Sequence, residues 1–231
     1  MRRSTVTRGL FVTGTDTGVG KTRVATALLS GLAAEGVRAI GMKPVAAGIE
    51  AGEARSADVT ALINAAGAAA AIADINPFSF VPPIAPHVAA ARAGTFIDLE
   101  TIAAAYARLA VRAQAVVVEG AGGALTPLSD RTDMLDIAAR LGVPVLLVVG
   151  VRLGCLNHAL LTAQAIRARG LELVGWVANR IDPAMPEADA NVATLVRILP
   201  APLIADLPWQ ISNGAGAPIR GAALAALGLA G

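Results

Sequence analysis

The stretch that decides the fold is residues 10–22, which read Leu10-Phe11-Val12-Thr13-Gly14-Thr15-Asp16-Thr17-Gly18-Val19-Gly20-Lys21-Thr22. A short apolar run leads into a glycine-rich turn, then Gly-Lys-Thr, then a helical pattern. Glycines let backbone N–H groups approach phosphate oxygens, and the following helix N-terminus adds partial positive charge. In this pattern Lys21 reaches the β- and γ-phosphates, and the Thr22 hydroxyl can bind Mg²⁺. The stretch therefore predicts a phosphate-binding loop.

The loop departs from the usual Walker A spacing by one residue. Four residues normally separate the first glycine from Gly-Lys-Thr, whereas five separate Gly14 from Gly20. The usual spacing would need glycine at position 15, which is threonine. The strand pattern before the turn and the helix pattern after it still favour a phosphate loop over a chance glycine-rich turn.

Composition restricts the class of protein. Apolar residues make up 55% of the chain and aromatic residues only 3%. The longest strongly apolar run, 143–151, is about half the ~20 residues of a membrane helix, so it is predicted to be a buried strand and no membrane partner is expected. The net charge is +2, with no stripe of Lys and Arg, so no nucleic-acid partner is expected. A single cysteine, Cys155, and the lack of a signal-peptide pattern predict a cytoplasmic protein.

Strand patterns alternate with helix patterns along almost the whole chain. Strands are predicted at 10–13, 37–42, 115–119, 144–149, 172–178 and 202–206, and helices at 21–34, 58–66, 87–93, 99–112, 133–141, 156–169 and 188–198. Strands joined by such helices favour right-handed crossovers and a mostly parallel sheet covered by helices on both faces, which is an α/β three-layer sandwich. One domain over residues 1–231 is predicted, with a short basic tail at 1–8.

The stretch 76–87 interrupts this alternation. It contains four prolines, which are too many for a helix interior or a central strand. We interpret it as an ordered excursion from the main pattern.

Polar residues follow the predicted strands, where a parallel sheet binds its ligands. Glu119 directly follows an apolar strand and suits a Mg²⁺ ligand, and the glycines after it let the backbone approach a ligand. Lys43 ends another strand, which favours an anionic partner over a solvated surface role. Asp58 lies where a loop becomes a helix. This position by itself indicates only an early-turn carboxylate that the helix dipole favours.

As a set, these motifs resemble the dethiobiotin synthetase family, ATP-dependent ligases of biotin synthesis. The displaced first glycine of the loop is itself a feature of that family. The matching segments occur in family order at 12–17, 19–22, 43–46, 86–87, 118–123, 153–159, 175–179 and 208–209. The resemblance implies a P-loop NTPase-like fold.

The resemblance also implies a reaction. Family members join CO₂ to 7,8-diaminononanoate and close a ureido ring, using ATP and Mg²⁺, to give dethiobiotin, ADP and phosphate. A carbamate forms, attacks the γ-phosphate to give a carbamic–phosphoric anhydride, and the second amine then displaces phosphate. Bringing two anions together requires concentrated positive charge and positioning rather than a strong base.

Residue roles follow from the same resemblance. Catalytic roles are implied for Lys43, Lys21 and Thr17, and Mg²⁺ binding for Thr22, Asp58 and Glu119. Asn179 matches the adenine-reading residue, and Pro208 and Trp209 match the wall beside the purine. The full set implied to bind nucleotide is Gly18, Val19, Gly20, Lys21, Thr22, Asp58, Glu119, Gly120, Ala121, Gly122, Asn179, Arg180, Pro208, Trp209 and Gln210. Substrate contacts are implied for Thr17, Lys43 and Ala47 and, from the neighbouring subunit of a homodimer with a shared site, for Gly154, Cys155, Leu156 and Asn157.

Two positions depart from the family pattern. Ala47 stands where the family typically has serine, which removes one hydroxyl contact worth on the order of 1 kcal/mol. Gly18 stands where some members have an acidic residue, so no carboxylate acts there.

The sequence argues against three other functions. A regulatory switch ATPase of the partition or division type typically carries a lysine early in the loop and often a basic C-terminal helix. Here positions 14–18 lack lysine, and residues 221–231 are neutral. An amidotransferase-linked cobyrinate-type ligase would need a second domain and a nucleophilic cysteine motif. A small-molecule kinase would need an arginine-rich lid after the loop.

Overall fold

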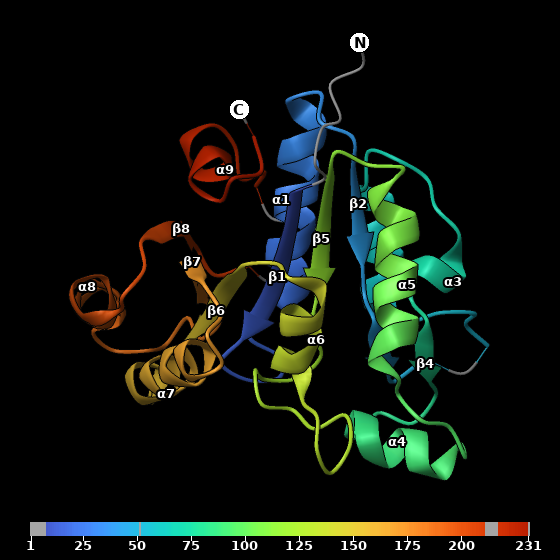
Figure 1. Ribbon diagram of the computed structural model, residues 1–231. Coiled ribbons are helices and arrows are strands. Elements are labelled where there is room, and N and C mark those ends of the chain that lie inside the picture. The colour runs from blue at the N-terminus through green and yellow to red at the C-terminus, as the bar shows by residue number, and fades with distance from the viewer. Residues whose placement is uncertain (1–7, 51, 211–216, 231) are drawn as a thin grey trace.

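A parallel sheet organises the part of the chain that the computed structural model describes, residues 8–50, 52–210 and 217–230. Within those residues the main sheet has the order β2-β5-β1-β6-β7-β8, and every pairing in it is parallel (Figure 1). Its strands are β1 (Arg8–Gly14), β2 (Ala39–Met42), β5 (Ala115–Glu119), β6 (Val145–Val151), β7 (Leu173–Arg180) and β8 (Leu203–Leu207). The predicted parallel sheet is confirmed.

Helices cover both faces of this sheet. Successive side chains of a strand point to opposite faces, so they pack into two different hydrophobic clusters. Leu10 and Val12 of β1 pack with α1, whereas Phe11 between them packs with α5 and α6. Figure 1 accordingly shows α1 behind the sheet and α5 and α6 in front of it. The helices are α1 (Lys21–Ala34), α2 (Ala57–Ala65), α3 (Ile72–Ile75), α4 (Pro86–Arg92), α5 (Leu99–Ala110), α6 (Met134–Leu141), α7 (Cys155–Ala168), α8 (Ala188–Ile198) and α9 (Ala222–Ala226). The three-layer α/β sandwich is therefore confirmed.

Side-chain caps fix where several helices begin. Asp98 accepts hydrogen bonds from the backbone N–H groups of Glu100 and Thr101 at the start of α5. Asp133 and Asp136 form a capping box at the start of α6. Such caps satisfy N–H groups that the helix itself leaves unpaired and contribute about 1 kcal/mol each.

The starts of α1 and α7 are built differently. Each follows a glycine in the left-handed region, Gly20 with φ 90° and Gly154 with φ 94°, and no described side chain caps either helix. The Cys155 N–H donates to the Arg152 carbonyl at 3.0 Å, but no described side chain satisfies the other first-turn N–H groups of these two helices, which suit an anionic ligand. Both helices start at the carboxyl edge of the sheet, α1 after β1 and α7 after β6.

Several short elements were not predicted. β3 (Val45–Ala47) and β4 (Phe78–Phe80) form a separate two-stranded parallel sheet, and α3 and α9 are one-turn helices. β4 lies inside the proline-rich excursion, which contributes no strand to the main sheet. The other predicted boundaries agree with the structure to within two residues. Apart from Arg8, the predicted basic tail lies outside the described residues. The described helices include none with both the length and the apolar character to cross a membrane.

Candidate active site

Four side chains meet at the carboxyl edge of the sheet, behind the phosphate loop. Thr22 Oγ1 lies 2.9 Å from Asp58 Oδ1 and 2.7 Å from Glu119 Oε1. Lys43 Nζ lies 2.9 Å from Asp58 Oδ2 and 2.5 Å from Glu119 Oε1, and it donates to the Gly120 carbonyl at 3.2 Å. The structure therefore brings together Thr22, Lys43, Asp58 and Glu119, from α1, the end of β2, the start of α2 and the end of β5.

Burial and charge shift the pKa values of this cluster. Glu119 is fully buried and Lys43 is 4% exposed. Burial raises the pKa of Glu119 above its usual range, against the opposing attraction of Lys43. Burial alone would lower the pKa of Lys43, but the two carboxylates outweigh it and raise that pKa. The pKa of Asp58 is lowered, because Lys43 outweighs the effect of burial.

The cluster has the ligand chemistry that Mg²⁺ requires. The Thr22 hydroxyl carries one proton, so it cannot donate to Asp58 and Glu119 at once. The second oxygen of Glu119, Oε2, is buried and has no hydrogen-bond partner among the described residues. Hard cations such as Mg²⁺ take oxygen ligands of this kind. The residues present thus fit a magnesium ion.

Lys21 completes the positive charge at the site. It is 6% exposed, and its Nζ donates to the backbone carbonyl of Asp16 in the phosphate loop at 2.9 Å. Burial, helped by the nearby charge of Lys43, lowers the pKa of Lys21 to about 8. A phosphate ligand would replace the Asp16 carbonyl as its partner, because Lys21 is the lysine of the Gly-Lys-Thr motif.

The phosphate loop is tied to the segment before α7 through a carboxylate that the sequence did not single out. Asp16 Oδ1 accepts a hydrogen bond from the Thr17 N–H at 2.7 Å, and Asp16 Oδ2 lies 2.6 Å from the Arg152 guanidinium. This contact places the start of α7 beside the loop. Asp16 and Arg152 were missed because only the folded chain brings residues of two loops together.

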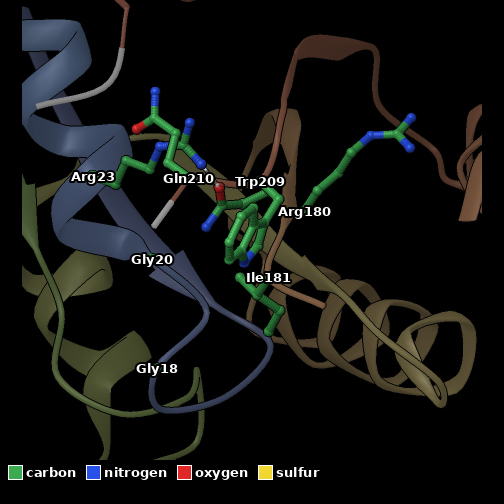
Figure 2. A pocket seen from close by; sticks show the side chains of 8 residues that line it. Gly18, Gly20, Arg23, Arg180, Ile181, Trp209 and Gln210 are labelled. Atoms are coloured by element: carbon green, nitrogen blue, oxygen red, sulfur yellow. Dashed lines mark hydrogen bonds between the residues drawn. The ribbon is translucent and has the colours of Figure 1, made fainter. Parts of the chain in front are cut away.

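A pocket of about 240 Å³ opens beside the loop. It is lined by Gly18, Gly20, Arg23, Asn179, Arg180, Ile181, Trp209 and Gln210. Asn179 Nδ2 donates to the Val19 carbonyl at 2.8 Å, and Asn179 Oδ1 accepts from Arg23 at 2.7 Å. In Figure 2 the labelled side chains of Arg23, Trp209 and Gln210 gather at this pocket. Arg23 and Ile181 are additions to the predicted set.

The Arg180 side chain has a different surrounding. It points away from Arg23 and Gln210 in Figure 2, and its guanidinium pairs with Asp206 at 2.8 Å and with Asp189 at 2.6 Å. Pro208, which precedes Trp209, is exposed. Nucleotide contacts from Arg180 and Pro208 stay predictions.

The remaining predicted residues lie on three segments around the cluster. Thr17 is exposed on the phosphate loop, and Ala47 is half-buried at the end of β3. Gly122, with φ 67°, lies in the loop after Glu119. At the start of α7 Cys155 is buried, whereas Asn157 is exposed.

Comparisons with known proteins identify the family. The family model described as "AAA domain" matches residues 8–215. The chain is 54% identical to the ATP-dependent dethiobiotin synthetase BioD of Nitrosospira multiformis, over 90% of this chain and 91% of that protein. It is 51% identical to the protein of the same name from Aromatoleum aromaticum, over 87% and 90%.

Solved structures share the fold at low identity. A ParA family ATPase from Chlorobium tepidum is 14% identical, with a TM-score of 0.55 over 90% of this chain and 86% of its own. The MinC:MinD cell division complex of Aquifex aeolicus gives 18% identity and a TM-score of 0.57 over 88% and 82%. These likenesses concern the fold alone. The identity to the curated relatives over nine-tenths of their length shows that the chain belongs to the ATP-dependent dethiobiotin synthetase family.

Proposed function

We propose that the chain is a dethiobiotin synthetase, which uses ATP to join CO₂ to 7,8-diaminononanoate and closes the ureido ring of dethiobiotin. The observation that carries this proposal is the buried cluster of Lys43, Glu119, Asp58 and Thr22 behind a phosphate loop. The alternative, a regulatory switch ATPase, is not favoured, since the curated relatives at about half identity are ligases by name.

Positive charge is the main chemical contribution of the protein. The reaction brings an anionic carbamate against the γ-phosphate of ATP, and both anions repel each other unless cations lie between them. Lys21 and Lys43 provide two buried ammonium groups at this place, and Lys43 is held rigidly by its two carboxylate partners. Thr17, at the turn of the loop, holds the carbamate end. Positioning by these groups lowers the barrier without a strong base.

Thr22, Asp58 and Glu119 would hold Mg²⁺. When bound, the ion neutralises negative charge on the phosphates. Binding would satisfy the unpartnered Glu119 Oε2 and relieve the conflict over the single Thr22 proton.

The remaining contacts of the proposal lie across a homodimer. The Cys155 N–H donates to the Arg152 carbonyl at 3.0 Å, and the next two N–H groups of α7, those of Leu156 and Asn157, suit the substrate carboxylate because no described side chain caps this helix. Leu153, beside this start, is a large apolar residue with 89% of its surface exposed. Burial of Leu153 against a second subunit would put the start of α7 at the interface, as a shared site requires. We assign the enzyme to the cytoplasm, in keeping with its single, buried cysteine.

A direct assay tests the ligase function. The protein is incubated with 7,8-diaminononanoate, bicarbonate, Mg²⁺ and ATP, and dethiobiotin is quantified. We expect dethiobiotin to form, and Lys21→Ala or Lys43→Ala to lower turnover by at least ~10²-fold. ATP hydrolysis that does not depend on the diamine, without dethiobiotin, would refute the proposal. Near-normal rates for Lys43→Ala would refute the role of that lysine.

The shared site has its own test. Lys21→Ala and Asn157→Ala proteins, each inactive as homodimers, are mixed under conditions that exchange subunits. Heterodimers then contain one intact site, so part of the activity returns. No recovery, despite proven exchange, would contradict a site shared between subunits.

A further inference from the structure

Arg23 places a guanidinium group in the pocket beside the phosphate loop. It lies on the first turn of α1, directly after Thr22, and lines the pocket together with Asn179, Trp209 and Gln210 (Figure 2). Its terminal nitrogen donates to Asn179 Oδ1 at 2.7 Å. Its Nε is buried and has no hydrogen-bond partner among the described residues. A buried donor without a hydrogen-bond partner costs folding free energy, so we expect a ligand to supply an acceptor for this N–H group.

Arg23 and Asn179 offer two different sets of hydrogen-bonding groups to a purine base. A side-chain amide offers two N–H donors and two acceptor positions on its oxygen. Asn179 has committed one donor to the Val19 carbonyl and one acceptor position to Arg23. The donor and the acceptor position that remain on Asn179 still match the N7 acceptor and the amino group of adenine, whereas the guanidinium fork of Arg23 matches the N7 and O6 acceptors of guanine.

The other lining side chains do not favour one purine over another. The Trp209 ring offers a stacking surface, and the amide of Gln210 can turn either way. The Arg180 guanidinium is occupied by Asp206 and Asp189. The balance between donors and acceptors therefore depends on Arg23, which can only donate.

We infer that Arg23 sets base selectivity and opens the pocket to 6-oxopurine nucleotides, so that GTP and ITP bind about as well as ATP. The inference rests on the proposed function only in that the pocket holds the base of the phosphate donor. Lys21, the first residue of the same helical turn, donates to the Asp16 carbonyl of the loop, while Arg23 donates to Asn179. The two cations thus serve opposite ends of the nucleotide.

Titration calorimetry with ATP, GTP and ITP, in the absence of the diamine, tests the inference. For the unaltered protein we expect Kd values for GTP and ATP within about 3-fold of each other. Arg23→Met should raise the ratio of Kd for GTP to Kd for ATP by about 5-fold or more, the discrimination that one bidentate contact supplies. Arg23→Lys keeps the charge but loses the planar fork, so its ratio should shift in the same direction. Arg167→Met, on an exposed position of α7, is the matched control and should leave the ratio unchanged.

Two results would overturn the inference. Equal weakening of ATP and GTP binding by Arg23→Met, with rescue by Arg23→Lys, would make Arg23 a phosphate contact. A strong preference of the unaltered protein for ATP would also refute it. Dethiobiotin formation with ATP is measured on the same samples. Its absence, with the expected Kd ratios, would reject the ligase function but leave the role of Arg23 intact.

Discussion

Replacing Lys43 by methionine removes the ammonium group that compensates two carboxylates at the edge of the sheet. Lys43 is 4% exposed and its ion pair with Glu119 measures 2.5 Å, while Glu119 is fully buried. Without Lys43, Glu119 either remains ionised in a place shielded from water or takes up a proton. Breaking a buried pair by removing one partner typically costs 3–5 kcal/mol, so we expect a loss of about 4 kcal/mol in unfolding free energy at pH 8.

The loss should depend on pH in a defined direction. The pKa of Lys43 is raised, so the stability that Lys43 contributes is fully present below its usual pKa of 10.5 and is lost only as the pH rises through the raised pKa. Burial already raises the pKa of Glu119, and removing Lys43 raises it further. A raised carboxyl pKa favours the protonated, neutral form as the pH falls. The penalty of Lys43→Met should therefore be smaller at pH 5.5 than at pH 8.

Urea unfolding of the single and double variants measures this. Lys43→Met/Glu119→Leu has no buried lone carboxylate at position 119, so it should recover at least about half of the lost stability at pH 8. The control is Arg140→Met, because Arg140 pairs with Glu100 at the surface, and it should cost less than about 1 kcal/mol. A double variant no more stable than Lys43→Met, or equal losses at both pH values, would show that the cost does not come from an uncompensated charge on Glu119.

Three further predictions concern the phosphate loop and one helix cap. Gly20→Ala should abolish tight ATP binding, because a Cβ at position 20 would lie 2.0 Å from Asn179 Nδ2. The control is Gly36→Ala, because Gly36 also has a positive φ but no atom lies within 4 Å of an added Cβ. This control should cost only backbone strain of about 1–2 kcal/mol and leave the Kd for ATP unchanged. The pKa of Lys21 is about 8, so the affinity for ATP, measured by calorimetry in EDTA, should fall between pH 8 and 9.5 as Lys21 loses its proton, by up to about 10-fold per pH unit. Over the same range the free energy of unfolding should rise, because Lys21 binds more protons in the unfolded chain than in the folded one. An affinity that does not change with pH would argue against Lys21 as the phosphate partner. Asp133→Ala removes the N-cap of α6 and the ion pair of Asp133 with Arg169. In a denaturant titration this variant should lower the free energy of unfolding by about 1–2 kcal/mol. An unchanged free energy would mean that water caps the helix equally well.

The sequence was sufficient for the main sheet because its strands are unusually clear. Residues 115–118 and 145–149 are continuous apolar runs, typical of strands buried on both faces, and they lie in β5 and β6. The pair β3 and β4 could not be predicted in this way. Each strand has only three residues, and they pair with each other from distant parts of the chain, so no local periodicity marks them.

The candidate site was predictable where a residue's position on a strand decided its role. Lys43 and Glu119 end neighbouring strands, and the fold brought them together. Asp58 was indicated only by family resemblance, because its contact with Thr22 depends on how α2 packs. Arg23 was missed because an arginine on an amphipathic helix is typical of a solvated face. Its link to Asn179 exists only once β7 lies beside α1.

The two buried ammonium groups have a chemical consequence. No other lysine occurs in the sequence, and every other basic side chain besides the two histidines is an arginine. Apart from the α-amino group, the nucleophilic amines of this protein are thus confined to its active site. Because Lys43 is held protonated while the pKa of Lys21 is about 8, Lys21 supplies the reactive neutral amine in mildly alkaline solution. A small acylating reagent should therefore modify lysine only at the active site, so labelling the chain through lysine should inactivate it.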